Sequence, residues 1–130
     1  MDNISISLKE SGTKDISEIR IDGVIDTLTA TELEGVIESL LKRNRYRMIV
    51  DLAGVDYISS AGWGIFISHI KDIHENGGDL KLANMIDNVS EIYELLEFDN
   101  VLKAYSTLEE ARDDFDDNEA SDEIKKKDQL

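Results

Sequence analysis

The sequence predicts an α/β domain with a mixed, mostly parallel sheet, an antiparallel N-terminal hairpin and about four flanking helices. Short apolar segments alternate with helical ones in the order β-β-α-β-α-β-α-β-α, and such alternation favours right-handed crossovers between parallel strands. With 41% hydrophobic and 33% charged residues, the 130-residue chain can build one apolar core. It contains no cysteine, which excludes disulfides and thiolate chemistry.

The first half of the chain predicts a hairpin, a helix and an interior strand. Apolar residues alternate with polar ones in 4–8 and 16–21, on either side of a turn at Gly12. Residues 27–42 place Leu33, Val36, Ile37, Leu40 and Leu41 on one helical face, with Thr27 or Thr29 available as the cap. The short apolar run 48–52 is typical of an interior strand, and a loop should follow it.

The next two elements are a second helix and a strand that is polar on one side. The helix should begin near Ser60 and end at the Gly77-Gly78 pair, with its Phe66, Ile70 and Ile73 facing inward. Residues 80–85 predict the strand.

A third helix, a last strand and a fourth helix complete the prediction. Asp87 or Asn88 can cap the third helix, and residues 101–104 suggest the strand. Thr107, followed by Glu110, is a capping-box signature for the fourth helix. Four apolar residues of the third helix have the spacing for burial: Val89, Ile92, Tyr93 and Leu96.

The predicted domain covers residues 1–112, and residues 113–130 form an acidic tail. The tail reads DDFDDNEASDEIKKKDQL and has too few apolar residues to offset the entropy of ordering it. We therefore expect it to be a frayed helix end followed by a disordered segment.

The charge of the chain limits its partners. A formal net charge of −15 argues against nucleic acid and anionic membranes, because both repel a polyanion. The basic residues in 42–47 and 125–127 are more typical of helix C-termini than of a nucleic-acid site. No signal peptide is visible, and the apolar stretches are far shorter than the roughly 20 residues that cross a bilayer. A cytoplasmic protein is expected.

The segment VDLAGVDYISSAGWGIF, residues 50–66, is the candidate functional site. It reads as a strand, a loop and a helix start crowded with small residues, so that serine hydroxyls project where backbone amides are unpaired. A helix N-terminus favours negative charge by about 0.3–1 kcal/mol at an exposed site. A phosphate on a serine there would therefore preserve the helix and turn away a partner that docks on it.

Three sequence elements resemble the STAS domain of the anti-sigma factor antagonist family. The strongest is DYISSAGWG, residues 56–64, which is similar to the family's turn at the start of its second helix. Gly23-Val24-Ile25-Asp26, followed by Thr29-Ala30, and GGDLKL, residues 77–82, are similar to two further family elements. The resemblance spans about residues 4–112.

The resemblance implies a phosphorylation-controlled partner switch rather than an enzyme, with no cofactor and no metal. The partner would be an anti-sigma factor that is also a serine kinase of the histidine-kinase-like ATPase fold, and a PP2C-type phosphatase would reverse its action. The phosphoacceptor aligns with Ser60, two residues before Gly62, with Ser59 as the alternative. Asp26 would lie beside the acceptor loop at Ser59 and Ser60, and Gly62, Trp63 and Ser68 would join that loop in the docking surface.

Three positions depart from the family pattern. Ser59 stands where many members have aspartate, and Val24 stands where they have glutamate, which puts kinase recognition in question. Trp63 replaces a smaller aliphatic residue. It either anchors a partner, as tryptophan often does in binding hot spots, or packs over the edge of the sheet.

Other functions also fit parts of the sequence. A STAS module can also switch a non-sigma target, such as a phosphatase or a biofilm regulator. A receiver-type domain would use Asp51 at the end of the central strand as its phosphorylated aspartate, but needs an acid pair to hold magnesium. A serine nucleophile elbow needs glycine where Ile58 stands. His69 and His74 are five residues apart on one helix and read as structural residues.

Overall fold

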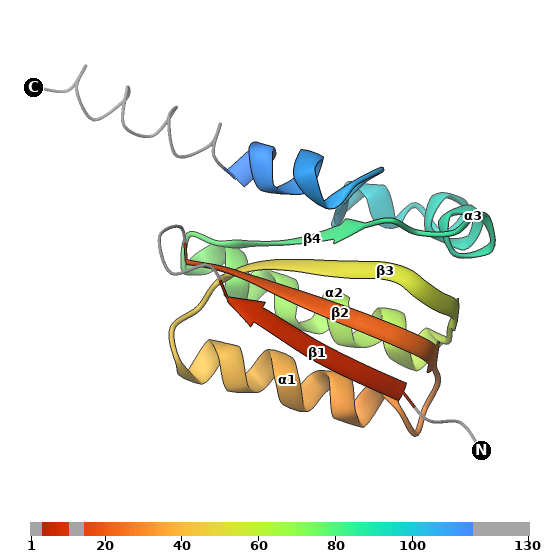
Figure 1. The fold of residues 1–130 in the computed structure, drawn as a ribbon, viewed down its shortest axis with the longest axis horizontal. Helices are drawn as coiled ribbons and strands as arrows, with labels where there is room; N and C mark the ends of the chain where they lie inside the picture. Colours follow the sequence, from red (N-terminus) through yellow and green to blue (C-terminus); the bar gives the residue numbers. More distant parts are fainter. Residues whose placement is uncertain (1–3, 11–14, 116–130) are drawn as a thin grey trace, which may run out of the picture.

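The computed structural model describes residues 4–10 and 15–115, which form a five-stranded sheet with helices on both faces. The strands lie in the order β1-β2-β3-β4-β5; β1 is antiparallel to β2, and the other pairs are parallel (Figure 1). This arrangement confirms the predicted fold class. The elements are β1 (Ile4–Glu10), β2 (Ile16–Ile25), α1 (Ala30–Lys42), β3 (Arg47–Ile58), α2 (Ser60–Glu75), β4 (Asp79–Ala83), α3 (Asp87–Leu95), the short 3-10 helix η1 (Phe98–Asn100), β5 (Lys103–Tyr105) and a last helix at residues 108–115.

Alternation along the strands produces two separate apolar layers. In β3, Met48 and Val50 belong to the main core with α1 and α2, whereas Ile49 belongs to the core beneath the last helix. Ala111 and Phe115 of the last helix pack in that second core. Figure 1 shows this helix on the side of β4 away from α1.

The central strand is longer than predicted. The expectation of a strand at 48–52 followed by a loop is wrong, because β3 continues to Ile58. A register shift in its pairing with β2 brings Gly54 opposite Asp22, where a Cβ on residue 54 would lie 1.9 Å from Asp22 Oδ1. Glycine therefore lets the strand continue where the sequence suggests a break.

The predicted caps of two helices have different outcomes. α1 begins at Ala30, and Thr29, one of the two threonines predicted as its cap, occupies the N-cap position, although its side chain makes no capping bond. Asp87 is the first residue of α3 instead of its cap, since Ile86 takes that position. Asp87 still lies in the first turn, where a carboxylate favours the helix.

The last helix extends past the predicted domain boundary at residue 112. Thr107 Oγ1 accepts a hydrogen bond from the Glu110 N–H at 3.1 Å, which confirms the predicted cap. Helical structure continues to residue 115, and Phe115 is buried. The predicted tail beyond that point and the turn at Gly12 lie outside the described residues.

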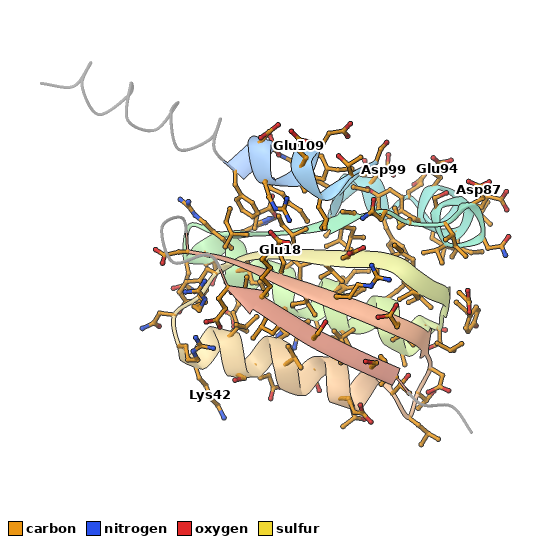
Figure 2. The ribbon with its side chains drawn as sticks, in the orientation of Figure 1. Glu18, Lys42, Asp87, Glu94, Asp99 and Glu109 are labelled. Atoms are coloured by element: carbon orange, nitrogen blue, oxygen red, sulfur yellow. The ribbon has the colours of Figure 1, made fainter. Side chains whose placement is uncertain are left out.

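Acidic side chains gather over one side of the fold. Figure 2 shows Asp87 and Glu94 on α3, Asp99 on η1 and Glu109 on the last helix. Lys42 lies at the opposite side, at the end of α1. In the part of the chain that the structure describes, no helix combines the length and apolarity needed to span a membrane.

Candidate functional site

The candidate site lies where β3 passes into α2. The last residues of β2 and β3, Ile25 and Ile58, are register partners, so Asp26 and Ser59 leave the sheet side by side. The Ser59 N–H donates to the Ile25 carbonyl at 2.8 Å, which ties the start of α2 to the end of β2. The sheet therefore brings together two site elements that are 33 residues apart in the sequence.

The two adjacent serines have different surroundings. Ser59 is the N-cap of α2, and its Oγ accepts a hydrogen bond from the Gly62 N–H at 3.3 Å. Ser60 is the first residue of the helix and is exposed. The first turn of α2, which lies wholly within the described residues, carries no acidic side chain that would oppose a phosphate on Ser60.

Gly62 lets the helix start approach the sheet closely. A Cβ at this position would lie 2.6 Å from Ile25 Cγ2 and 2.8 Å from Ile58 Cγ2. The glycine thus holds Ser59 and Ser60 directly over the strand ends, while Gly64 of the same helix has open space around it.

Asp26 shapes the turn before α1. Its Oδ1 accepts hydrogen bonds from the backbone N–H groups of Leu28 and Thr29, both at 2.9 Å. In return, its own N–H donates to Thr29 Oγ1 at 2.8 Å. The carboxylate therefore stabilises the loop beside Ser59 and presents Leu28, which is 78% exposed, to solvent.

Trp63 packs inside the fold. Its side chain is 3% exposed, and its ring contacts Phe98 at 4.9 Å and Tyr93 at 6.2 Å between centroids. Its Nε1 has no hydrogen-bond partner among the described residues. Of the two interpretations of Trp63, the structure shows the packing one, since so little of the ring is available to a partner.

An apolar groove of about 310 Å³ opens beside Ser60, between α2, α3 and η1. Ile92 and Leu96, which the helical spacing predicts to be buried, are 38% and 54% exposed on its wall, so that prediction is wrong for both. Val89 and Tyr93 of the same helix are buried as predicted. The groove is lined by Tyr57, Ile58, Ser60, Trp63, Gly64, Ile67, Ile92, Leu96 and Phe98.

Ser68, predicted to join the docking surface, is exposed one residue beyond the groove-lining Ile67. Its hydroxyl donates to the Ile65 carbonyl at 3.0 Å within α2. The structure thus places it on the same helix as Ser60 but outside the groove.

Asp51 does not have the surroundings of a receiver phosphoacceptor. It lies in the interior of β3 and is buried, where its carboxylate pairs with Arg20 Nη1 at 3.2 Å and accepts from Asn84 Nδ2 at 3.1 Å. Hydrogen bonds with Asp22 and then with Asp51 raise the pKa of Arg20. Arg20 therefore occupies this carboxylate as an ion-pair partner.

Neither histidine is placed as a catalytic base for Ser60. His69 Nε2 lies 3.2 Å from Glu34 Oε2, and His74 Nε2 lies 2.9 Å from Asp79 Oδ1. Both imidazoles are thus engaged with carboxylates elsewhere, and the geometry does not support a nucleophile elbow.

The fold and the site together define a small α/β domain whose candidate site is an exposed serine at a strand-to-helix junction. The STAS domain family model matches residues 8–111, and the chain belongs to this family.

Several relatives and fold neighbours are named as anti-sigma factor antagonists. The chain is 28% identical over 101 residues to an anti-sigma-B factor antagonist of Listeria monocytogenes, covering 78% of this chain and 88% of that one. Its fold resembles an anti-sigma factor antagonist of Mycobacterium paratuberculosis with a TM-score of 0.79, at 21% identity over 88% and 95% of the two chains. It also resembles the phosphorylated form of the Bacillus cell fate determinant SpoIIAA with a TM-score of 0.65, at 17% identity over 84% and 97%.

Proposed function

We propose that the chain is an anti-sigma factor antagonist whose docking to an anti-sigma factor is controlled by phosphorylation of Ser60. The observation that carries the proposal is the position of Ser60, exposed at the first residue of α2 and on the rim of the apolar groove. Its relatives named anti-sigma-B factor antagonist support the class of partner. SpoIIAA, a fold neighbour, has structures in phosphorylated and unphosphorylated forms.

Unphosphorylated protein offers its partner an apolar surface. Ile92 and Leu96 expose apolar side chains on the groove wall. A partner that fits this surface inserts apolar side chains of its own. Trp63 supports the groove from beneath.

Phosphorylation of Ser60 places about −1.5 to −2 charges at the rim of this groove. The helix N-terminus tolerates that charge, so the fold persists. A partner side chain that enters the apolar groove, however, then meets a hydrated dianion, and docking is lost. Ser59 is the weaker candidate for the acceptor because its hydroxyl already caps α2.

We further propose which enzymes add and remove the phosphate. The anti-sigma factor itself is the serine kinase, with the histidine-kinase-like ATPase fold, and a PP2C-type phosphatase restores the hydroxyl. The chain is the substrate of both activities and has none of its own. Asp26 contributes by ordering the loop beside the acceptor.

Phosphate mapping and binding measurements test this function. After incubation with the cognate kinase and ATP, mass spectrometry should find phosphate on Ser60. Ser60→Asp should bind the anti-sigma factor at least tenfold more weakly, a loss of about 1.4 kcal/mol, whereas Ser59→Asp keeps an N-cap and should bind nearly as well as wild type. Phosphate on Ser59, or equal binding by Ser60→Asp and wild type, contradicts the proposed control.

The groove is tested separately from the phosphate. Leu96→Ala removes exposed apolar surface and should weaken binding to the unphosphorylated protein without loss of folding. Leu8→Ala is the matched control, because Leu8 is 42% exposed on β1, at the other end of the sheet from Ser60. If both variants bind like wild type, the groove is not the docking surface.

A further inference from the structure

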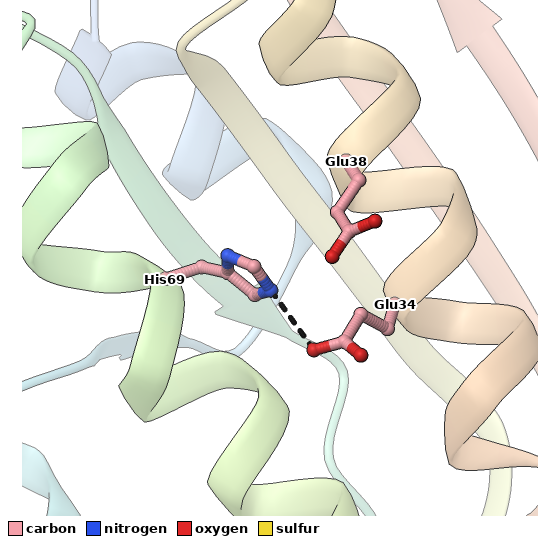
Figure 3. Close-up of side chains that lie close together, drawn as sticks. All are labelled: Glu34, Glu38 and His69. Carbon is pink, nitrogen blue, oxygen red and sulfur yellow. Dashed lines mark hydrogen bonds and ion pairs between the residues drawn. The ribbon is translucent and has the colours of Figure 1, made fainter.

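A second cluster of polar side chains lies between α1 and α2. Glu34 and Glu38 extend from α1 toward His69 of α2, as Figure 3 shows. One potential ligand atom from each residue lies within 4.8 Å of the other two. His69 Nε2 and Glu34 Oε2 are 3.2 Å apart.

The two helices hold these side chains on facing surfaces. Glu34 and Glu38 are four residues apart, one helical turn, so both carboxylates point to the same side of α1. They are like charges at neighbouring positions and repel each other unless a cation lies between them. The side chain of His69 is 15% exposed and reaches across from α2 to meet them.

The spacing suits three ligands of one metal ion. Zn²⁺ binds imidazole nitrogen and carboxylate oxygen at about 2.0–2.2 Å in tetrahedral geometry, so neighbouring ligand atoms stand about 3.3 Å apart. The distance between His69 Nε2 and Glu34 Oε2, 3.2 Å, is close to this value. Glu38 is exposed, and rotation of its side chain can bring its carboxylate to the same distance.

We propose that Glu34, Glu38 and His69 bind a divalent transition-metal ion of the zinc type and thereby join α1 to α2. The imidazole selects such an ion over Mg²⁺, which prefers oxygen ligands and octahedral geometry. Water completes the coordination, since the protein supplies three ligands. This site is independent of the proposed control through Ser60.

Calorimetric titration of the full chain with ZnCl₂ tests the proposal. Wild type should bind one ion per chain with a dissociation constant below about 100 µM, and excess MgCl₂ should not compete. His69→Gln and Glu38→Gln should each weaken binding at least tenfold. Glu38→Gln changes an exposed side chain and keeps the fold, so a folding defect in the other variant cannot obscure the result.

Two control variants separate this site from general attraction to an acidic protein. Glu32→Gln removes the same charge from an exposed position of α1, and His74→Gln removes the other histidine of the chain. Both should bind Zn²⁺ like wild type. Absence of saturable binding, competition by Mg²⁺, or equal losses in His69→Gln and His74→Gln would each overturn the proposal.

Discussion

Ser59 Oγ accepts a hydrogen bond from the Gly62 N–H at 3.3 Å, and this contact separates the roles of the two serines at the start of α2. One hydroxyl serves the helix, while the next, on Ser60, faces solvent at the rim of the groove. The same turn therefore provides a stable helix start and leaves the Ser60 hydroxyl accessible for the phosphorylation that we propose.

Alanine substitutions should separate these roles by stability alone. Ser59→Ala removes the cap and should lower the free energy of unfolding by about 1 kcal/mol. Ser60→Ala changes an exposed side chain and should alter it by less than about 0.5 kcal/mol. Urea unfolding followed by the fluorescence of Trp63, the one tryptophan of the chain, measures both. A larger loss for Ser60→Ala than for Ser59→Ala would reverse the assignment.

Gly62 and Gly64 form a second matched pair. Gly62→Ala places a methyl group against Ile25 and Ile58 and should cost about 1–3 kcal/mol, because the buried contact must shift. Gly64→Ala meets open space and should stabilise the helix by up to about 1 kcal/mol. Relative to wild type, the midpoint of thermal unfolding should therefore fall for Gly62→Ala and rise for Gly64→Ala. A lower midpoint for both variants would argue against close packing of the first turn.

The fold order and the position of the candidate site were accessible from local sequence signals. Apolar periodicity identifies elements whose residues are near one another in the chain, and the Ser59-Ser60 pair before Gly62 marks a helix start. Gly54 wrongly suggested that the central strand ends before it. A glycine is needed there because Asp22 of the neighbouring strand lies too close for a side chain. Such cross-strand contacts have no local signal.

The apolar groove and the cluster of Glu34, Glu38 and His69 both depend on packing between distant segments. Helical spacing places Ile92 and Leu96 near the buried face of α3, but only the structure shows that nothing in the described part of the chain covers them. His69 is 35 residues from Glu34 in the sequence. The two side chains are close because α1 and α2 pack against the same face of the sheet. Leu95, beside Leu96, is a third apolar residue of this region and is 74% exposed.

Lys81 is the clearest buried charge that depends on a distant partner. Its side chain is 0% exposed, and Nζ lies 2.7 Å from Asp114 in the last helix and 3.1 Å from Asp79. Asp114→Asn should therefore cost about 1–3 kcal/mol, since the buried ammonium keeps only one carboxylate. Lys103→Met is the control: Lys103 is 60% exposed and 4.0 Å from Asp114, and its loss should cost less than about 1 kcal/mol. Denaturant unfolding compares the two variants.

The contact between Lys81 and Asp114 should also make stability depend on pH. Hydrogen bonds from Lys81 and then from Tyr105 hold the pKa of Asp114 below its ordinary value of 3.8. A carboxyl group whose pKa is lower in the folded state stabilises the fold fully above the pKa of the unfolded state. That contribution is lost as pH falls through the folded value.

The difference in unfolding free energy between wild type and Asp114→Asn should therefore be constant from about pH 7 to pH 5 and shrink below about pH 4. The pKa values of Glu10 and Asp22 are also lowered, mainly by hydrogen bonds from Arg43 and Arg20 respectively. Their protonation at low pH destabilises wild type and variant alike, so the difference between the two proteins reports on Asp114 alone. Urea unfolding of both proteins at pH 7, 5 and 3 measures it. A difference that stays constant down to about pH 3 would mean that Asp114 has the same pKa in the folded and unfolded chain.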